Sequence, residues 1–281
     1  MNWLEALILG LVQGLTEFLP VSSSGHLAIG REILGVEASG DLIFEVTVHA
    51  ATVCATIVVF WKELWKLFAG LFKFKYNEET DYIAKIVVSM IPVLIVGVFF
   101  KDYVEALFAS MTVVGVALLV TALLLFFSDF AGRNNRRTAP AGYIRGGAPN
   151  NATEGSPTNE IGWLQAIVVG LGQACAVIPG LSRSGTTIST GLICGVKREV
   201  MAQFSFLMVL VPILGEAFLD VVGGDMAAST IGALPLMIGF VAAFVSGLFA
   251  CKVMIALVRK ARLSWFALYC AIIGVLVLVL S

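Results

Sequence analysis

The segment from Pro179 to Thr187 is the densest group of residues in the sequence that could bind an anion. Its Pro-Gly pair is expected to end one helix and a following serine to cap the next, whose N-terminus offers free N–H groups and a positive dipole end. Arg183 adds a planar charged fork that matches phosphate oxygens, although it could instead pair with a carboxylate and only fix the turn. The predicted phosphate-binding residues here are Ser182, Arg183, Ser184, Gly185, Thr186 and Thr187.

A second group, near the N-terminus, has the residue types needed for phosphoryl hydrolysis. Gln13 and Glu17 are four residues apart and so lie on one face of a helix, which Pro20 is expected to end. Serines and a histidine follow at the turn, so a carboxylate, hydroxyls and an imidazole would converge beside the anion site. A lone histidine or buried glutamate is more often structural, but here both fall at a break in an apolar segment. The predicted catalytic residues are Glu17, Ser23, His26 and Arg183, with Ser22 and Ser24 as further phosphate ligands.

These patterns leave the attacking group open. Ser23 or its neighbour Ser22 could be a nucleophile, His26 could form a phospho-enzyme, or Glu17 and His26 could activate water.

Glu45 and His49 form another pair four residues apart. They could support Glu17 from a neighbouring helix, or they could simply begin a helix in the headgroup region. The sequence favours neither interpretation.

Composition indicates that these groups belong to a membrane protein. Of 281 residues, 59% are hydrophobic and 13% are charged, whereas about a quarter of the residues in soluble domains are charged. The net charge of −1 says nothing about nucleic acid, but no basic patch stands out as a binding face, so no nucleic-acid partner is expected. Crossing a hydrocarbon core takes about 20 apolar residues. The predicted spans are Ile43–Trp61, Tyr82–Phe100, Met111–Phe130, Met201–Val222, Ser229–Leu248 and Ser264–Leu280.

Two further apolar stretches, residues 3–34 and 163–196, are interrupted by helix breakers and repeat each other at an offset of 160 residues. The shared tryptophan, glutamine and Ser-x-Ser-Gly are not apolar filler, so we interpret the repeat as a duplication. The matching pairs are Trp3 and Trp163, Leu4 and Leu164, Ala6 and Ala166, Gly10 and Gly170, Gln13 and Gln173, Ser22 and Ser182, Ser24 and Ser184, Gly25 and Gly185, and Phe44 and Phe204.

The distribution of Lys and Arg predicts that each interrupted stretch enters the membrane and returns on the same side. As a helix, residues 3–18 would span only about 24 Å of a core that is about 30 Å thick. If both stretches are re-entrant, 15 of the 17 basic residues other than Arg183 fall on one side, whereas two full crossings would divide them 9 to 8. Cytoplasmic loops are enriched in basic residues, so the re-entrant topology is favoured.

The expected fold is an all-α membrane protein with six full transmembrane helices and two re-entrant helix hairpins. Each half has three spans, an odd number, so the halves are inverted and one hairpin enters from each side. The hairpin tips can then meet near the midplane, with Glu17 close to His26, and form a polar site. The expected organisation is a first repeat at 1–131, a polar cytoplasmic loop at 132–160 and a second repeat at 161–281, with both termini outward.

Both groups of polar residues resemble a known family, the bacterial undecaprenyl-pyrophosphate phosphatases, also called bacitracin-resistance proteins. The family's pattern is Glu or Gln followed after three residues by Glu, then a histidine, then Pro-Gly-x-Ser-Arg-Ser-x-x-Thr. This chain has Gln13-x-x-x-Glu17, His26 and the complete second motif from Pro179. The resemblance covers nearly the whole chain. The chain departs from it in a longer polar loop and in His49, where an amide is expected.

The resemblance implies an activity, a location and a cofactor. The activity is hydrolysis of undecaprenyl pyrophosphate to undecaprenyl phosphate and inorganic phosphate, on the outward face of the bacterial cytoplasmic membrane. This recycles the lipid carrier for cell-wall synthesis and confers resistance to bacitracin, which would compete for the lipid rather than bind the protein. The implied cofactor is a divalent cation, Mg²⁺ or Ca²⁺, with Glu17 and Gln13 as candidate ligands. The oligomeric state stays open.

Two other functions fit the sequence less well. A phosphatidic-acid-phosphatase type enzyme needs a Lys before an Arg-Pro and a histidine six residues after the Arg of its Ser-Arg motif; this chain has Ser189 there and no Arg-Pro. A transporter or flippase of the polyprenyl phosphate carrier would also have inverted repeats with broken helices. Glu17 beside His26 favours hydrolysis, because moving a lipid phosphate requires no acid–base pair.

Overall fold

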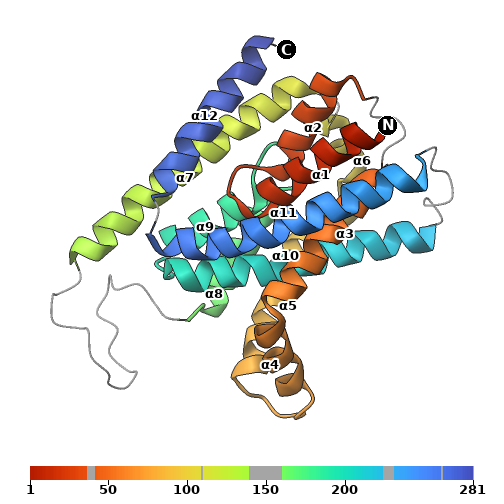
Figure 1. The fold of residues 1–281 in the computed structure, drawn as a ribbon. Helices are drawn as coiled ribbons and strands as arrows, with labels where there is room; N and C mark the ends of the chain where they lie inside the picture. The colour runs from red at the N-terminus through yellow and green to blue at the C-terminus, as the bar shows by residue number, and fades with distance from the viewer. Residues whose placement is uncertain (37–41, 109, 139–159, 224–230, 261, 281) are drawn as a thin grey trace.

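The computed structural model of the protein describes residues 1–36, 42–108, 110–138, 160–223, 231–260 and 262–280. The regular elements within these ranges are α-helices, with no β-strand among them (Figure 1). The all-helical class predicted from the sequence is confirmed. The helices are α1 (Trp3–Phe18), α2 (Ser23–Leu34), α3 (Leu42–Val59), α4 (Trp61–Leu71), α5 (Glu78–Phe99), α6 (Lys101–Phe108), α7 (Met111–Thr138), α8 (Trp163–Cys175), α9 (Arg183–Ile193), α10 (Arg198–Gly223), α11 (Ala233–Lys260) and α12 (Leu263–Leu280).

Five helices in the described residues are long and apolar enough to cross a membrane, namely α5, α7, α10, α11 and α12. A sixth span results if α3 and α4 are counted together, although the chain bends by 79° between them. The chain is therefore a multi-pass membrane protein. The span predicted at roughly Ile43–Trp61 corresponds to α3, and the sequence did not predict the bend into α4 that follows it. The exposed rings of Trp61, Trp65 and Phe68 stack along α4.

Helix α7 is longer than the sequence predicts. It continues to Thr138, so the first residues of the polar loop expected at 132–160 are helical. The segment 133–138 contains neither Pro nor Gly, and so nothing in it ends the helix where the apolar residues stop. Residues 139–159, and the expected start of a span at Ser229, lie outside the described residues.

The two helix breaks predicted from the sequence are present. The first break separates α1 from α2, and the second separates α8 from α9. Ser22 Oγ accepts from Gly25 N at 3.3 Å and caps α2, while Ser182 Oγ accepts from Gly185 N at 3.0 Å and caps α9. The same residues of the repeated Ser-x-Ser-Gly motif thus begin a new helix in each half.

The two breaks also contact each other. Ser184 Oγ, in the second half, donates to the Leu19 carbonyl oxygen at 3.1 Å. Gly180 has a φ of +88°, which favours glycine, and a Cβ there would lie 2.5 Å from the Val114 carbonyl oxygen of α7. Only glycine therefore lets the second break pack this closely on α7. The two helix breaks therefore meet, as the sequence predicts for this part of the chain.

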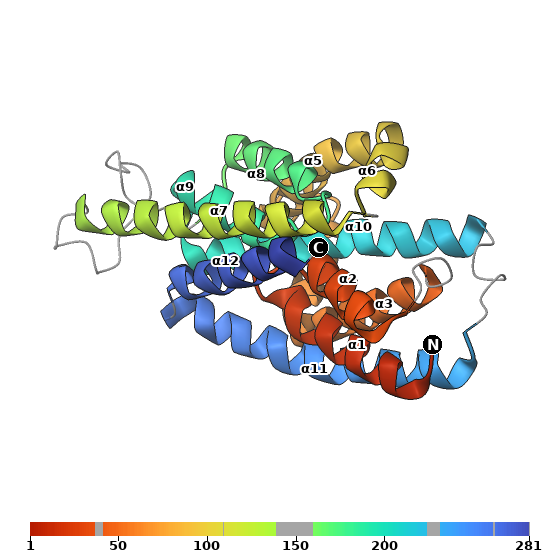
Figure 2. The ribbon, with the colours of Figure 1, turned by 90° about the horizontal axis from the view of Figure 1, so that it is seen from above.

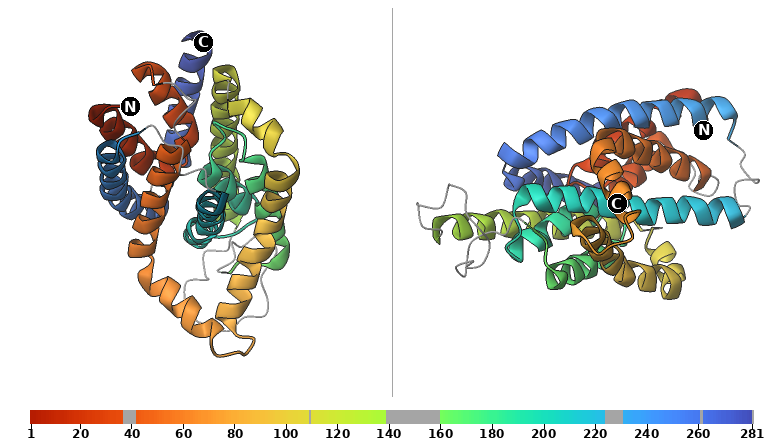
Figure 3. Two further views of the ribbon diagram at one scale, coloured as in Figure 1. Left: turned by 90° about the vertical axis from the view of Figure 1, so that its right-hand side faces the viewer. Right: turned by 90° about the horizontal axis from the view of Figure 1, so that it is seen from below.

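Each broken helix pair packs mainly on a helix of the other half. Helix α1 lies along α11, α8 lies along α5, and α7 packs beside α12 (Figure 2). Gly10 and Gly170, partners in the repeat, allow the first two crossings: an added Cβ would lie 2.5 Å from the Gly239 carbonyl oxygen and 2.3 Å from the Ser89 carbonyl oxygen, respectively. The N-terminal end of α1 and the C-terminal end of α12 lie at the opposite end of the molecule from α4 (Figure 3).

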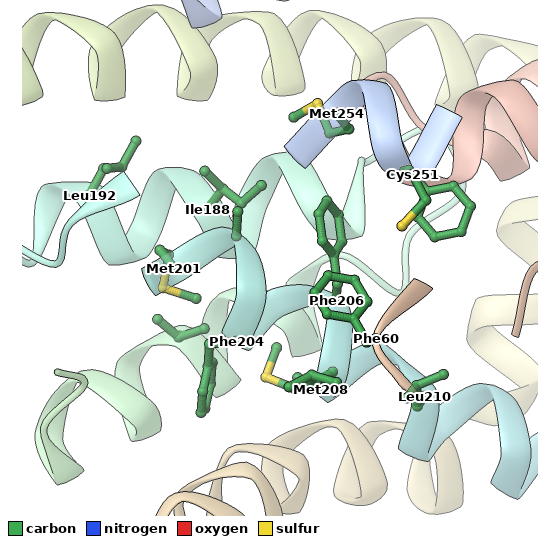
Figure 4. Packing of buried hydrophobic residues seen from close by; sticks show 14 of the residues in the cluster. Phe60, Ile188, Leu192, Met201, Phe204, Phe206, Met208, Leu210, Cys251 and Met254 are labelled. Carbon is green, nitrogen blue, oxygen red and sulfur yellow. The ribbon is translucent and has the colours of Figure 1, made fainter. Parts of the chain in front are cut away.

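A cluster of buried apolar side chains supports the second break (Figure 4). Phe204 and Met208 of α10 pack with Ile188 of α9 and with Cys251 and Met254 of α11. Lipid provides little hydrophobic force between helices, so close packing and dispersion hold such a cluster together. The cluster fixes α9, and with it the arginine at its first position.

Candidate functional site

A small cavity lies where the two breaks meet. Its walls come from α1, α2, α3, α9, α10 and the breaks themselves. Its volume of about 20 Å³ has room for roughly one water molecule. The predicted site residues that line it are Glu17, Ser22, Ser23, Ser24, Ser182, Arg183 and Ser184.

Glu17 is buried in the wall of this cavity, with its side chain 6% exposed. Its Oε2 atom accepts hydrogen bonds from Gln13 Nε2 at 2.9 Å and from Ser23 Oγ at 2.5 Å. Its Oε1 atom lies 3.6 Å from a guanidinium nitrogen of Arg183. A buried carboxylate is tolerated only with such partners, which here come from α1, α2 and α9.

Arg183 brings the second half of the chain to Glu17. The 3.6 Å separation is an ion pair rather than a well-formed hydrogen bond, and a guanidinium carries five N–H donors. The Arg183 side chain is 25% exposed and lines the cavity, so donors are left for a phosphate group. A purely structural role for Arg183 would require a carboxylate partner, and Glu17 is such a partner. Glu17 is, however, itself a predicted catalytic residue.

The serines of the two breaks have matching arrangements. Ser22 Oγ lies 3.3 Å from Ser24 Oγ in the first break, and Ser182 Oγ lies 3.4 Å from Ser184 Oγ in the second. All four line the cavity. Two helix N-termini, each with the positive end of its dipole, therefore begin at the same cavity, an arrangement suited to an anion.

The other predicted phosphate ligands of α9 are not among the residues that line the cavity. Gly185 N–H is used by the Ser182 cap. Thr187 Oγ1 donates to the Arg183 carbonyl oxygen at 2.8 Å and lies 2.7 Å from Ser205 Oγ. Thr186 Oγ1 is buried, with no hydrogen-bond partner in the described part of the chain.

His26 has partners other than the expected Glu17. Its Nδ1 is 2.7 Å from the Ser22 carbonyl oxygen, and its Nε2 is 2.8 Å from the hydroxyl of Tyr269 in α12. The His26 and Tyr269 rings stack, with centroids 5.5 Å apart. His26 is not among the residues that line the cavity.

The histidine beside Glu17 is His49. Its Nε2 lies 3.9 Å from Glu17 Oε2, and its Nδ1 lies 2.8 Å from the Glu45 carbonyl oxygen. The Glu45 carboxylate instead pairs with Arg31 at 3.2 Å. Of the two residues whose role the sequence left open, His49 therefore neighbours the site and Glu45 connects α3 to α2.

Sequence reasoning missed several polar residues at the site. Thr52, Thr56 and Ser205 line the cavity, and Tyr269 contacts His26. Thr52 and Thr56 follow His49 at helical spacing on α3, a signal that could have identified them. No sequence pattern marks Tyr269, because only the packing of α12 brings it to the first break.

The residues around Glu17 fit a divalent cation that takes few ligands from the protein. Gln13 Oε1 is buried and has no hydrogen-bond partner among the described residues, so an oxygen acceptor is left beside the carboxylate. No group of three or more His, Cys, Asp or Glu side chains suited to holding a metal occurs in that part of the chain. A cation here would therefore need most of its oxygens from phosphate and water, which is common for Mg²⁺.

Similarity to known proteins extends along the whole chain. The family model of the bacitracin resistance protein BacA matches residues 6–276. The undecaprenyl-diphosphatase of Parabacteroides distasonis is 54% identical, with 98% of this chain and 96% of the relative aligned. Those of Bacteroides thetaiotaomicron and Carboxydothermus hydrogenoformans are 52% and 37% identical, with at least 98% of each chain aligned. The match includes both broken helix pairs and the cavity between them, and the chain therefore belongs to the bacitracin resistance protein BacA family.

Proposed function

We propose that this protein hydrolyses undecaprenyl pyrophosphate to undecaprenyl phosphate and inorganic phosphate. Relatives named undecaprenyl-diphosphatase are 52% to 54% identical over nearly the whole chain, which supports the substrate and the reaction. The contact of Glu17 with both Ser23 and Arg183 is the observation that carries the proposal. It joins a proton acceptor, a hydroxyl and a phosphate-binding cation at one cavity.

Ser23 is the proposed attacking group. Its hydroxyl donates to Glu17 Oε2 at 2.5 Å, so Glu17 can accept the proton as the serine oxygen bonds to the terminal phosphorus. The bond from that phosphorus to the bridging oxygen breaks, and undecaprenyl phosphate leaves. Water then releases inorganic phosphate from the serine. The role of His26 in this scheme is to hold the turn, since both of its ring nitrogens are engaged.

Arg183 is the proposed holder of the transferred phosphoryl group. Its planar fork can bind two phosphate oxygens, and its charge opposes the charge that develops on them in the transition state. Thr187 supports it from within α9 by donating to its carbonyl oxygen. The further proposed phosphate ligands are Ser22, Ser24, Ser182 and Ser184.

We also propose that the reaction requires a divalent cation, Mg²⁺ or Ca²⁺. When bound, the ion would neutralise negative charge on the pyrophosphate. Glu17 supplies a carboxylate for it and Gln13 a buried amide oxygen. The Gln13 amide nitrogen donates to Glu17, so the two side chains are in direct contact.

The proposed topology is six crossings, counting α3 and α4 as one, and two re-entrant hairpins, α1–α2 and α8–α9. The repeats 1–131 and 161–281 would be inverted, joined by the cytoplasmic segment 132–160. The packing of the two hairpins supports this. Helix α1 of the first repeat packs on α11 of the second, and α8 of the second packs on α5 of the first. The two helix pairs occupy corresponding positions in an inverted duplication. Both termini and the site would face outward from the bacterial cytoplasmic membrane.

In the cell, this activity would recycle the lipid carrier for cell-wall synthesis. Bacitracin would then compete for the pyrophosphate lipid rather than bind the protein. If so, excess lipid should relieve inhibition by bacitracin, and excess protein should not. A transporter or flippase function for the carrier is less well supported, because the relatives are named for hydrolysis.

Phosphate release from undecaprenyl pyrophosphate by the purified protein in detergent tests the proposal. We expect release with Mg²⁺ or Ca²⁺, loss of release on chelation, and recovery when either ion is restored. Full activity in chelator would remove the cation from the proposal. If no phosphate is released under any of these conditions, the hydrolytic function itself is wrong.

A further inference from the structure

Helix α12 reaches the first break through two consecutive residues. The Tyr269 hydroxyl is 2.8 Å from His26 Nε2, and the two rings are stacked with 8° between their planes. Cys270 Sγ lies 3.7 Å from the Pro20 carbonyl oxygen. A helix from the end of the chain therefore supports the turn between α1 and α2.

The partners of the His26 ring determine where its proton lies. The Ser22 carbonyl oxygen, 2.7 Å from Nδ1, can only accept a hydrogen bond, so Nδ1 carries the hydrogen. In the neutral imidazole Nε2 is then an acceptor, and the Tyr269 hydroxyl donates to it. The Ser22 carbonyl therefore sets the tautomer, and the Tyr269 hydroxyl holds the ring at its other nitrogen.

Ser22 has a backbone conformation that must be held by its surroundings. Its φ is 71°, in the left-handed region that residues other than glycine rarely adopt. Its carbonyl oxygen accepts from both the backbone N and the ring Nδ1 of His26. The next residue is Ser23, whose hydroxyl must reach Glu17. A small change in the Ser22 backbone would therefore redirect Ser23.

We propose that Tyr269 is a positioning residue for this reaction. By holding the His26 ring at Nε2, it keeps Nδ1–H on the Ser22 carbonyl and so keeps the Ser23 hydroxyl against Glu17, without touching the substrate. The inference rests on the proposed function. Loss of one supporting hydrogen bond should lower kcat by about 5- to 10-fold, with KM little changed.

Nitrogen NMR of the histidines tests the contact directly. The chain has two histidines, so ¹⁵N-histidine labelling gives two sets of ring signals, and His49→Gln identifies those of His26. We expect a single Nδ1–H tautomer for His26 in the wild-type protein. Tyr269→Phe keeps the stacked ring but removes the hydroxyl, so the His26 Nε2 signal should shift as its hydrogen bond is lost, and kcat should fall. Tyr103→Phe, at an exposed tyrosine of α6, is the matched control and should change neither.

Three results would overturn the proposal. An Nε2–H tautomer at His26 in the wild-type protein would do so without any variant. Identical His26 spectra in wild type and Tyr269→Phe would do so too, as would a shifted Nε2 signal with an unchanged kcat. Unchanged His49 signals verify that Tyr269→Phe is folded. The spectra need no substrate, so a wild-type protein that releases no phosphate would refute the proposed function and leave the tautomer assignment to be judged separately.

Discussion

At the scale of single residues, Glu17 joins parts of the chain that are far apart in sequence. Gln13 and Ser23 donate to one of its oxygens, and Arg183 lies beside the other. A carboxylate that accepts from a hydroxyl and faces a guanidinium can serve as a base, as a cation ligand, or as both. The formal charge at this position is the property that these roles share.

Replacing Glu17 with Gln tests that charge, because it keeps the size of the side chain and much of its hydrogen bonding. We expect kcat for phosphate release to fall by about 100-fold or more, as is typical when charge stabilisation in the transition state is lost. Glu32→Gln, at an exposed position on α2, is the control and should have wild-type kinetics. Near wild-type hydrolysis by Glu17→Gln, with unchanged cation dependence, would make Glu17 a structural residue.

Replacing Arg183 with Lys separates the geometry of the guanidinium from its charge. Lys keeps the charge but cannot bind two phosphate oxygens in a fork, so we expect most activity to be lost, by about 100-fold in kcat, in a protein that still folds. Steady-state phosphate release and size-exclusion chromatography measure the two effects. Full activity in Arg183→Lys would mean that a point charge is sufficient.

At the scale of the helices, a buried ion pair connects three elements from both halves. Asp129 of α7 accepts from Arg198 of α10 at 2.9 Å and from the hydroxyl of Ser264 of α12. The Asp129 and Arg198 side chains are 4% and 13% exposed. Because the pair is shielded from water, the loss of one member should matter far more than the loss of an exposed ion pair.

Asp129→Ala should therefore destabilise the fold, by about 3–5 kcal/mol in the free energy of unfolding. Denaturation of the protein in mixed detergent micelles measures the change. Lys66→Ala is the comparison: Lys66 is 69% exposed and lies 3.5 Å from Glu79, so its removal should leave the unfolding midpoint unchanged. Equal shifts of the unfolding midpoint in the two variants would show that burial of the Asp129 pair adds nothing to the stability of the fold.

At the scale of the whole molecule, the arrangement of helix ends bears on topology. The ends of α1 and α12 lie away from α4, whose sequence and following turn contain several lysines (Figure 1). This grouping agrees with a basic side formed by α4 and by the C-terminal end of α7, opposite both termini. The proposed re-entrant topology predicts which of these ends a reagent outside the cell can reach.

Cysteine labelling in intact cells tests this statement. All five native cysteines are first replaced with alanine, because Cys54 and Cys175 are exposed. A cysteine inserted after Met1 should react with a membrane-impermeant thiol reagent, and Thr138→Cys should react only after the cells are opened. Labelling of Thr138→Cys from outside would overturn the topology, and protection of both positions would contradict the outward N-terminus.

Local chemistry in the sequence was sufficient to predict the helix class, the two breaks and most of the polar residues around the cavity. Pro and the capping serines act within a few residues, so the end of α1 and the starts of α2 and α9 could be predicted without knowing their neighbours. The same holds for the pairing of Gln13 with Glu17, which helical spacing requires. The extension of α7 was missed because a helix that leaves the membrane no longer needs apolar residues.

Only the tertiary structure decided which polar groups meet across the two halves. The sequence placed His26 with Glu17 because they are near in the chain, whereas packing brings His49 to Glu17 and Tyr269 to His26. The contact between Glu17 and Arg183 likewise depends on the two breaks meeting. Such contacts follow from how α3, α9 and α12 pack in three dimensions, and helix packing depends on side-chain shape over the whole interface, which no local pattern encodes.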